Sequence, residues 1–142
     1  FILQFGRRGA KEGEFNYPTY IAADSEGKVY VTDALNFRVQ VFDENNKFLF
    51  SIGHPGDSSG SFSRPKGVAV DSFGHIYVMD GLFDNMQIFN KNKEFLLSLG
   101  QAGKSDGEFW LPGGLAIDHE DYIYVADSYN QRIQILRYLG KE

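Results

Sequence analysis

The chain has 142 residues, including 13 Phe, 8 Tyr and 16 Gly but no Cys, and its formal net charge is −5. The net charge argues against non-specific nucleic-acid binding, which needs clustered Lys and Arg, and the lack of Cys excludes disulfides and thiolate metal sites. The length suits one domain, and the aromatic and Gly content favours an all-β protein with short strands. No apolar run reaches the ~20 residues that span a bilayer, and no signal peptide is visible, so we expect a soluble chain of unknown compartment.

Residues 1–6, FILQFG, predict a short apolar strand that ends at a Gly. The adjacent sequence offers no strand to pair with it. A small domain rarely starts on such a strand, so we expect its partner to lie elsewhere.

A repeat of 47 residues organises the rest of the chain. Pro18, Pro65 and Pro112 are separated by this interval, without a gap. The other positions shared by all three copies are Asp24, Asp71 and Asp118; Tyr30, Tyr77 and Tyr124; Asp33, Asp80 and Asp127; and Gln40, Gln87 and Gln134. We therefore divide the chain into an opening strand at 1–6 and three copies at 13–53, 60–100 and 107–140.

Each copy predicts four short strands, named a to d. They are expected at 21–23, 68–70 and 115–117 (a); 29–32, 76–79 and 123–126 (b); 38–42, 86–89 and 132–136 (c); and 48–53 and 95–100 (d, in the first two copies). The strands are apolar almost throughout, which is typical of a sheet that is covered on both faces. A four-stranded antiparallel sheet stacked between like neighbours is a blade of a β-propeller.

The shared pattern, G-x-F-x-x-P-x-G-[IV]-A-[VI]-D-x-x-G-x-[IV]-Y-V-x-D-x-x-N-x-R-[IV]-Q-[IV]-F, resembles the NHL repeat and covers almost the whole chain. The resemblance implies six-bladed propellers that mostly bind proteins or RNA, and a few related propellers are enzymes. This sequence departs from the pattern at Tyr20 (Gly67 and Gly114 in the other copies), at Phe83-Asp84-Asn85 (in place of Asn-x-Arg), at Trp110 (Asn16 and Ser63) and at Asp121 (Gly27 and Gly74).

Residues present in every copy are expected to serve blade geometry. Asp33 and Asp127 end strand b, and Arg38 and Arg132 begin strand c five residues later. The intervening turn would bring each Arg to its Asp as a charge-assisted structural clamp. The second copy has Asp80 but no Arg, so we expect its clamp to be weaker.

One loop face should carry the binding residues. Because strands a and b run in opposite directions, the b–c turns and the d–a connectors share one end of the blades, and loop faces are where repeat proteins vary. Exposed aromatic residues with Arg are typical of binding hot spots. The candidates on this face are Arg7, Arg8, Tyr20, Phe37, Arg64, Lys66, Phe83, Trp110 and Tyr129, with Leu35 beside them. Packing between blades is the alternative interpretation, above all for Leu35 and Trp110.

Three functions remain open. We favour a non-catalytic scaffold that binds a protein or peptide through this face. Single-stranded RNA is the alternative, since aromatic residues could stack on bases, although acidic residues share the same loops. The third is a metal-dependent lyase or lactonase, which the resemblance to related propellers allows.

No cofactor, catalytic residue or metal ligand is assigned. Related propeller lyases and lactonases hold metals in the central channel with His, Glu, Asn or Asp, whereas the strand a positions here are Ile, Ala, Val and Leu. His54, His75 and His119 occupy three different repeat positions at opposite ends of the blades, so they cannot converge on one zinc ion. We interpret all three as surface histidines.

Three blades are too few for a propeller, which typically has four to eight. The chain is either half of a longer six-repeat protein or one of two copies that assemble head to tail into a six-bladed ring, and we favour the homodimer. The third copy lacks strand d, and residues 1–6 align with FLFSIG (48–53) and FLLSLG (95–100) at the same interval. The opening strand is thus expected to complete the third blade of a partner (a velcro closure).

Overall fold

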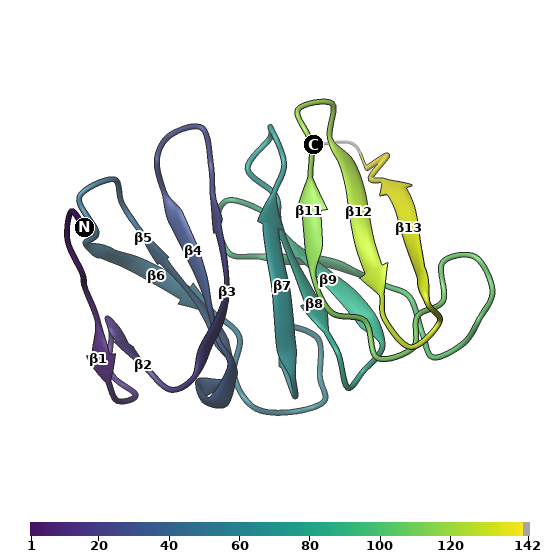
Figure 1. The fold of residues 1–142 in the computed structure, drawn as a ribbon, viewed down its shortest axis with the longest axis horizontal. Coiled ribbons are helices and arrows are strands. Elements are labelled where there is room, and N and C mark those ends of the chain that lie inside the picture. The colour runs from purple at the N-terminus through teal and green to yellow at the C-terminus, as the bar shows by residue number, and fades with distance from the viewer. Residues whose placement is uncertain (141–142) are drawn as a thin grey trace.

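Three antiparallel sheets stand side by side in this computed structural model, which describes residues 1–140 (Figure 1). We call the sheets blades 1, 2 and 3. Blade 1 consists of β3 (Pro18–Ala23), β4 (Val29–Asp33), β5 (Arg38–Phe42) and β6 (Phe48–Ile52); blade 2 of β7 (Pro65–Val70), β8 (Ile76–Asp80), β9 (Asn85–Phe89) and β10 (Phe95–Leu99); and blade 3 of β11 (Leu115–Ile117), β12 (Tyr122–Asp127) and β13 (Arg132–Arg137). The predicted all-β class and the antiparallel strand order within each copy are confirmed.

Strands β3 and β7 begin earlier than predicted, at Pro18 and Pro65. Proline lacks an N–H to donate, so it is tolerated as the first residue of a strand. Each pairs with the Asp that ends strand b, and the register then shifts before pairing resumes, between Pro18 and Tyr20 in blade 1. This irregularity carries strand a beyond the purely apolar segment from which we predicted it.

Residues 1–6 form no strand within the described chain. The segment leads into β1 (Arg7–Arg8), which pairs in parallel with β2 (Glu14–Phe15). The Phe5 ring packs on Phe42 of blade 1, with their centroids 5.1 Å apart. Pairing of residues 1–6 as a strand d therefore stays a prediction.

The hydrophobic core lies between the blades rather than inside any one of them. One cluster, which includes Val39, Val41, Phe62 and Val78, fills the space between blades 1 and 2. A second cluster, which includes Met86, Ile88 and Phe109, fills the space between blades 2 and 3. Both faces of blade 2 are therefore buried, and this explains why its strands are apolar almost throughout.

A glycine–phenylalanine contact repeats at every connector. A Cβ on Gly6, Gly53 or Gly100 would come within 2.5, 2.3 or 2.4 Å of the Phe ring nine residues later, and each of these glycines has a positive φ. Only Gly avoids both the clash and the strained backbone. The contact fixes the end of each strand d segment against the blade that follows.

Loops of two kinds gather at opposite edges of the blades. The b–c turns and the connectors lie along the lower edge in Figure 1, and the a–b and c–d turns lie along the upper edge. We call the first the connector face and the second the turn face. No helix within residues 1–140 is long and apolar enough to cross a membrane.

Candidate functional site

The connector face is held together by backbone hydrogen bonds within each blade. Leu35 N donates to Asn16 O at 3.0 Å, Gly81 N to Arg64 O at 2.9 Å and Tyr129 N to Trp110 O at 3.1 Å. Each b–c turn is thereby joined to the connector that enters the same blade. Side chains from these two segments consequently lie next to one another on this face.

A buried Asp anchors each connector from below. In blade 1, Arg38 Nε donates to Asp33 Oδ2 at 2.8 Å, and the Arg38 guanidinium also reaches the Lys11 and Glu14 carbonyl oxygens at 2.9 Å. Asn16 N donates to the other carboxylate oxygen at 2.7 Å. The pair links strand c, the turn and the connector, which is the geometry expected of a structural clamp.

Blade 3 repeats this arrangement. Arg132 Nε donates to Asp127 Oδ2 at 2.8 Å, and Trp110 N donates to Oδ1 at 2.8 Å. Burial by itself would raise the pKa of the Asp127 carboxyl, but hydrogen bonds from Trp110 N and from the Asn130, Arg132 and Gln134 side chains together lower it. The carboxylate is thus ionised where it holds the Trp110 backbone in place.

Blade 2 holds its connector differently. Asp80 accepts hydrogen bonds from the backbone N–H groups of Ser63, Arg64, Leu82 and Phe83, at 2.7 to 3.2 Å. Asn85 stands at the position of Arg38 and Arg132, and its Oδ1 is buried without a hydrogen-bond partner. The backbone bonds of the turn replace the missing guanidinium.

Trp110 and Tyr129 form the most compact group of predicted binding residues. Their ring centroids are 4.6 Å apart, and Lys104 Nζ lies 5.4 Å from the Trp110 ring centroid. The side chains remain 38% and 59% exposed. The alternative that Trp110 packs between blades is wrong, and so is the same alternative for Leu35, which is also exposed.

The predicted basic residues spread over the same face. Arg7, Arg8 and Arg64 are exposed, and Lys66 is half-buried. Arg7 Nε donates to Glu14 at 2.9 Å, whereas the Lys66 stem lies along Gly81. The four residues span blades 1 and 2, so they do not form one cluster with Trp110.

Three predicted aromatic residues lie deeper than expected. Tyr20 belongs to strand β3, packs on the core between blades 1 and 2 and reaches across to Gly113 and Gly114 of blade 3. Phe37 and Phe83 are half-buried in the b–c turns, and Phe37 has a positive φ. The placement of Tyr20 on a loop was wrong because β3 starts at Pro18.

Four exposed residues of the connector face were missed: Tyr17, Leu82, Lys104 and Leu111. Tyr17 and Leu111 occupy the same repeat position as Arg64, and Leu82 the same position as Leu35 and Tyr129. Comparing the copies at these positions would have found three of the four. The signal for Lys104 is absent from the repeat, because it depends on the turn that brings it over Trp110.

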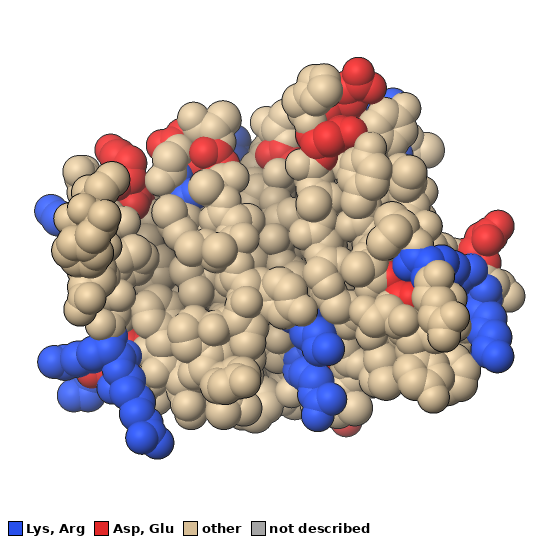
Figure 2. Space-filling model, viewed as in Figure 1, with Lys and Arg blue, Asp and Glu red and all other residues tan. Residues whose placement is uncertain are grey.

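Charge divides between the two edges of the molecule. Figure 2 shows Lys and Arg mainly along the lower edge, over the connector face, and Asp and Glu mainly along the upper edge, with both signs at the right-hand end. Several connector-face carboxylates are already engaged: Asp33 and Asp127 in the clamps, and Glu14 with Arg7. The connector face is therefore more basic than the net charge of −5 suggests.

On the turn face, an Asp–Tyr hydrogen bond repeats in each blade. The hydroxyls of Tyr30, Tyr77 and Tyr124 donate to Oδ2 of Asp24, Asp71 and Asp118, each at 2.9 Å. Burial first, and then the Asp partner, raise the pKa of Tyr30 and Tyr77, so both hydroxyls stay protonated. The sequence showed these positions as repeated but gave no sign that they bond each other.

His75 corrects the interpretation of all three histidines as surface residues. It is buried in blade 2, where its Nδ1 lies 2.7 Å from Asp71 Oδ2. His54 and His119 are exposed. Within residues 1–140, no group of three or more His, Cys, Asp or Glu side chains is arranged to hold a metal ion.

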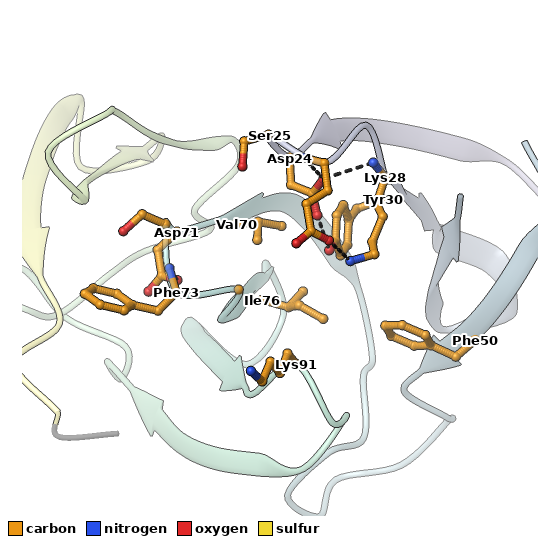
Figure 3. A pocket seen from close by; sticks show the side chains of 13 residues that line it. Asp24, Ser25, Lys28, Tyr30, Phe50, Val70, Asp71, Phe73, Ile76 and Lys91 are labelled. Atoms are coloured by element: carbon orange, nitrogen blue, oxygen red, sulfur yellow. Dashed lines mark hydrogen bonds and ion pairs between the residues drawn. The ribbon is translucent and has the colours of Figure 1, made fainter. Parts of the chain in front are cut away.

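A hollow of about 170 Å³ opens on the turn face between blades 1 and 2 (Figure 3). Its polar wall includes Asp24, whose Oδ1 accepts the Glu26 and Lys28 backbone N–H groups at 2.9 Å. Its Oδ2 accepts the Tyr30 hydroxyl, as the dashed lines of Figure 3 show. These turn hydrogen bonds account for the wall, so we assign the hollow no ligand.

Three antiparallel sheets that pack side by side and share one strand order form part of a β-propeller. Among solved structures, a streptogramin B lyase matches with a TM-score of 0.65 at 15% identity, over 85% of this chain and 37% of that one. At this identity the likeness shows the fold alone.

The NHL repeat matches at residues 15–42 and 109–136, the two copies that carry Asn-x-Arg. These two segments of the chain are therefore NHL repeats. It is 53% identical over 45 residues to the RING finger protein nhl-1 of Caenorhabditis elegans, and 44% identical over 48 residues to the protein lin-41 of the same animal. These segments cover 32% and 34% of this chain but 5% and 4% of the relatives, so the chain corresponds to a small part of each.

Proposed function

We propose that the chain is a non-catalytic binding module whose connector face holds a protein or peptide. The observation that carries the proposal is the Trp110–Tyr129 pair, whose rings lie close together at a tilt of 42° and stay exposed although the Trp110 backbone is held by Asp127. Rigid, exposed aromatic side chains provide contact area at little cost in conformational entropy.

The chemistry of the face favours an acidic peptide with apolar side chains. Leu35 and Leu82 are exposed on neighbouring b–c turns, where aliphatic contacts suit a peptide. Arg7, Arg8 and Arg64 would attract its carboxylates, and Arg is well suited to pairing with them. The exposed residues spread across blades, which suits an extended segment rather than a small molecule.

Peptide selection tests this proposal. A random dodecapeptide library would be panned on the immobilised 142-residue chain, and we expect acidic peptides with Leu or aromatic residues to be enriched. Trp110→Ala should weaken the selected peptides by about tenfold or more, because hot-spot truncations cost about 1.4 kcal/mol or more. Fluorescence anisotropy would measure each dissociation constant.

Phe73→Ala is the matched control, since Phe73 is an exposed aromatic residue on the turn face. It should leave binding unchanged. The connector face would be rejected as the binding site if Trp110→Ala and Phe73→Ala lowered the affinity equally, or if Trp110→Ala left the affinity of the selected peptides unchanged.

Single-stranded RNA is the second candidate, and one observation favours it: Lys104 lies over the same ring that a base could stack on. A fluorescein-labelled U12 RNA would provide the test. Binding that weakens steeply with salt and is lost in Trp110→Ala would favour RNA over a peptide, whereas absence of binding at low salt would exclude it.

We also propose that the working form is a closed six-bladed ring of two copies. Three blades fall below the usual range of four to eight. A ring would place the connector faces of both copies around one axis and extend the binding surface beyond blade 3.

A further inference from the structure

Blade 3 presents to solvent the surface that blades 1 and 2 bury. Val39 and Val41 of β5, and Met86 and Ile88 of β9, are fully buried against the next blade. The same repeat positions in β13 are Ile133 and Ile135, which are 64% and 59% exposed. We call this surface the trailing end face.

Blade 1 presents the opposite surface, the leading end face. Ile21 of β3 is 70% exposed, whereas its counterpart Val68 is buried against the preceding blade. A groove on the same side is lined by Phe5, Phe15, Tyr17 and Pro18. The two end faces thus carry the two halves of the interface that already joins blade 1 to blade 2.

Residues 1–6 already occupy the place of a strand d in front of blade 1. Gly6 meets Phe15 as Gly53 meets Phe62 and Gly100 meets Phe109. Phe5 packs on Phe42 at 5.1 Å, just as Ile52 belongs to the cluster that contains Phe89 of blade 2. What this segment lacks among the described residues is a strand c beside it.

We propose that residues 1–5 of one copy pair in antiparallel fashion with β13 of a second copy. The register follows from two existing pairings, in which Val39 lies opposite Ile52 and Met86 opposite Leu99. Ile133 occupies the repeat position of Val39, and Phe5 that of Ile52, so Ile133 would lie opposite Phe5. By the same equivalence, Ile135 would lie opposite Leu3. Every residue in these two pairs is an exposed hydrophobic side chain in the single copy.

The occupant that we propose is a second copy of these 142 residues. The N-terminal segment and β13 lie at opposite ends of the row of blades (Figure 1). The contact is head to tail, and such an interface gives a closed ring when the rotation closes. Two copies make two identical contacts and six blades. The inference rests on the proposed ring but not on the ligand of the connector face.

Cysteine cross-linking tests the register, because the chain has no Cys of its own. One sample would carry Phe5→Cys and the other Ile133→Cys, and the two would be mixed and oxidised. Directly opposite residues of antiparallel strands have Cα atoms about 4.5–5.5 Å apart, within reach of a disulfide. We expect a disulfide-linked dimer from the mixture.

Leu49→Cys is the matched control for Phe5→Cys. Leu49 is an exposed residue of β6, a strand that is already paired with β5, so its mixture with Ile133→Cys should give no linked dimer. Efficient cross-linking of the control but not of the Phe5 and Ile133 pair would overturn the register.

Light scattering of the unmodified 142-residue chain tests the assembly. We expect twice the chain mass, and we expect both removal of residues 1–6 and Ile135→Asp to raise the dissociation constant by about tenfold or more, since a charge would enter an apolar interface. A stable monomer overturns the ring and the pairing together, and open oligomers overturn closure. If the chain is a dimer and neither change raises its dissociation constant, the ring stands but the strand pairing is overturned.

Discussion

At the scale of single residues, one buried carboxylate per blade decides how the connector face is presented. Asp33, Asp80 and Asp127 each accept a backbone N–H from the connector residue two positions before the strand a Pro. In blade 3 that residue is Trp110, so the clamp and the proposed binding aromatic share a backbone. Losing the clamp should therefore affect both stability and binding.

Arg132→Met should lower the free energy of unfolding by about 2–4 kcal/mol at pH 7, because it leaves a buried carboxylate without its ionic partner. Urea denaturation at a fixed protein concentration would measure the loss. Arg8→Met is the control, since Arg8 is exposed, and should stay within about 0.5 kcal/mol of the unmodified chain. A loss of that small size in Arg132→Met would contradict a structural clamp.

The same variant carries a pH dependence. Because the pKa of Asp127 is lowered in the folded chain, its stabilisation is fully present above the ordinary value of 3.8 and is lost as the pH falls through the lower folded value. The stability difference between the unmodified chain and Arg132→Met should thus be largest above pH 4 and narrow below it. A difference that grew on acidification would contradict this sign.

Whether a side-chain contact can be predicted from the sequence depends on how far apart its residues lie along the chain. The Asp33 and Arg38 pair could be predicted because five residues and one turn separate them. The burial of His75 could not, since it follows from Tyr138 and the neighbouring strands closing over it. The Asp–Tyr bonds were visible only as two repeated positions.

At the scale of elements, blade 2 is the exception among three similar sheets. Its b–c turn has Phe83 and Asn85 where its neighbours have Asn and Arg, and Asn85 leaves a buried oxygen unbonded. The repeat showed that an Arg is missing here, and the weaker clamp expected from that stays a prediction. It could not predict that four backbone N–H groups would take over the bonding of Asp80.

Restoring the shared pattern should strengthen blade 2. The double variant Phe83→Asn with Asn85→Arg would add a guanidinium beside Asp80 and remove the unbonded oxygen, with an expected gain of about 0.5–2 kcal/mol in the free energy of unfolding. Asn92→Arg, on an exposed c–d turn, is the control for added charge. No gain in urea denaturation would mean that the existing backbone bonds already satisfy Asp80.

The strands themselves were predictable to within a few residues, because apolar side chains occupy both faces of each sheet, including the exposed end faces of blades 1 and 3. The starts of β3 and β7 were not, since Pro18 and Pro65 join their strands through a register shift rather than through apolar side chains. That error placed Tyr20 on a loop. Leu82 and Leu111 were missed for a different reason: the candidates were aromatic and basic residues, and Leu35 was the one aliphatic residue named with them.

At the scale of the whole molecule, two apolar end faces bound a row of three blades. Burying them in a dimer would couple unfolding to association, so the melting temperature should rise with protein concentration. Calorimetry over a hundredfold range of concentration would detect the shift. Ile135→Asp should flatten it, and a melting temperature independent of concentration in the unmodified chain would contradict dimerisation.

The repeated glycine–phenylalanine contact bears on the number of blades that a closed ring would contain. The same Gly–Phe contact joins each blade to the next, so this contact does not set how many blades a ring contains. The number is left to geometry: the small rotation from one blade to the next, added up until the first sheet meets the last. A mutation that opened that angle slightly would alter no single contact, yet it would change the circumference at which the row closes on itself.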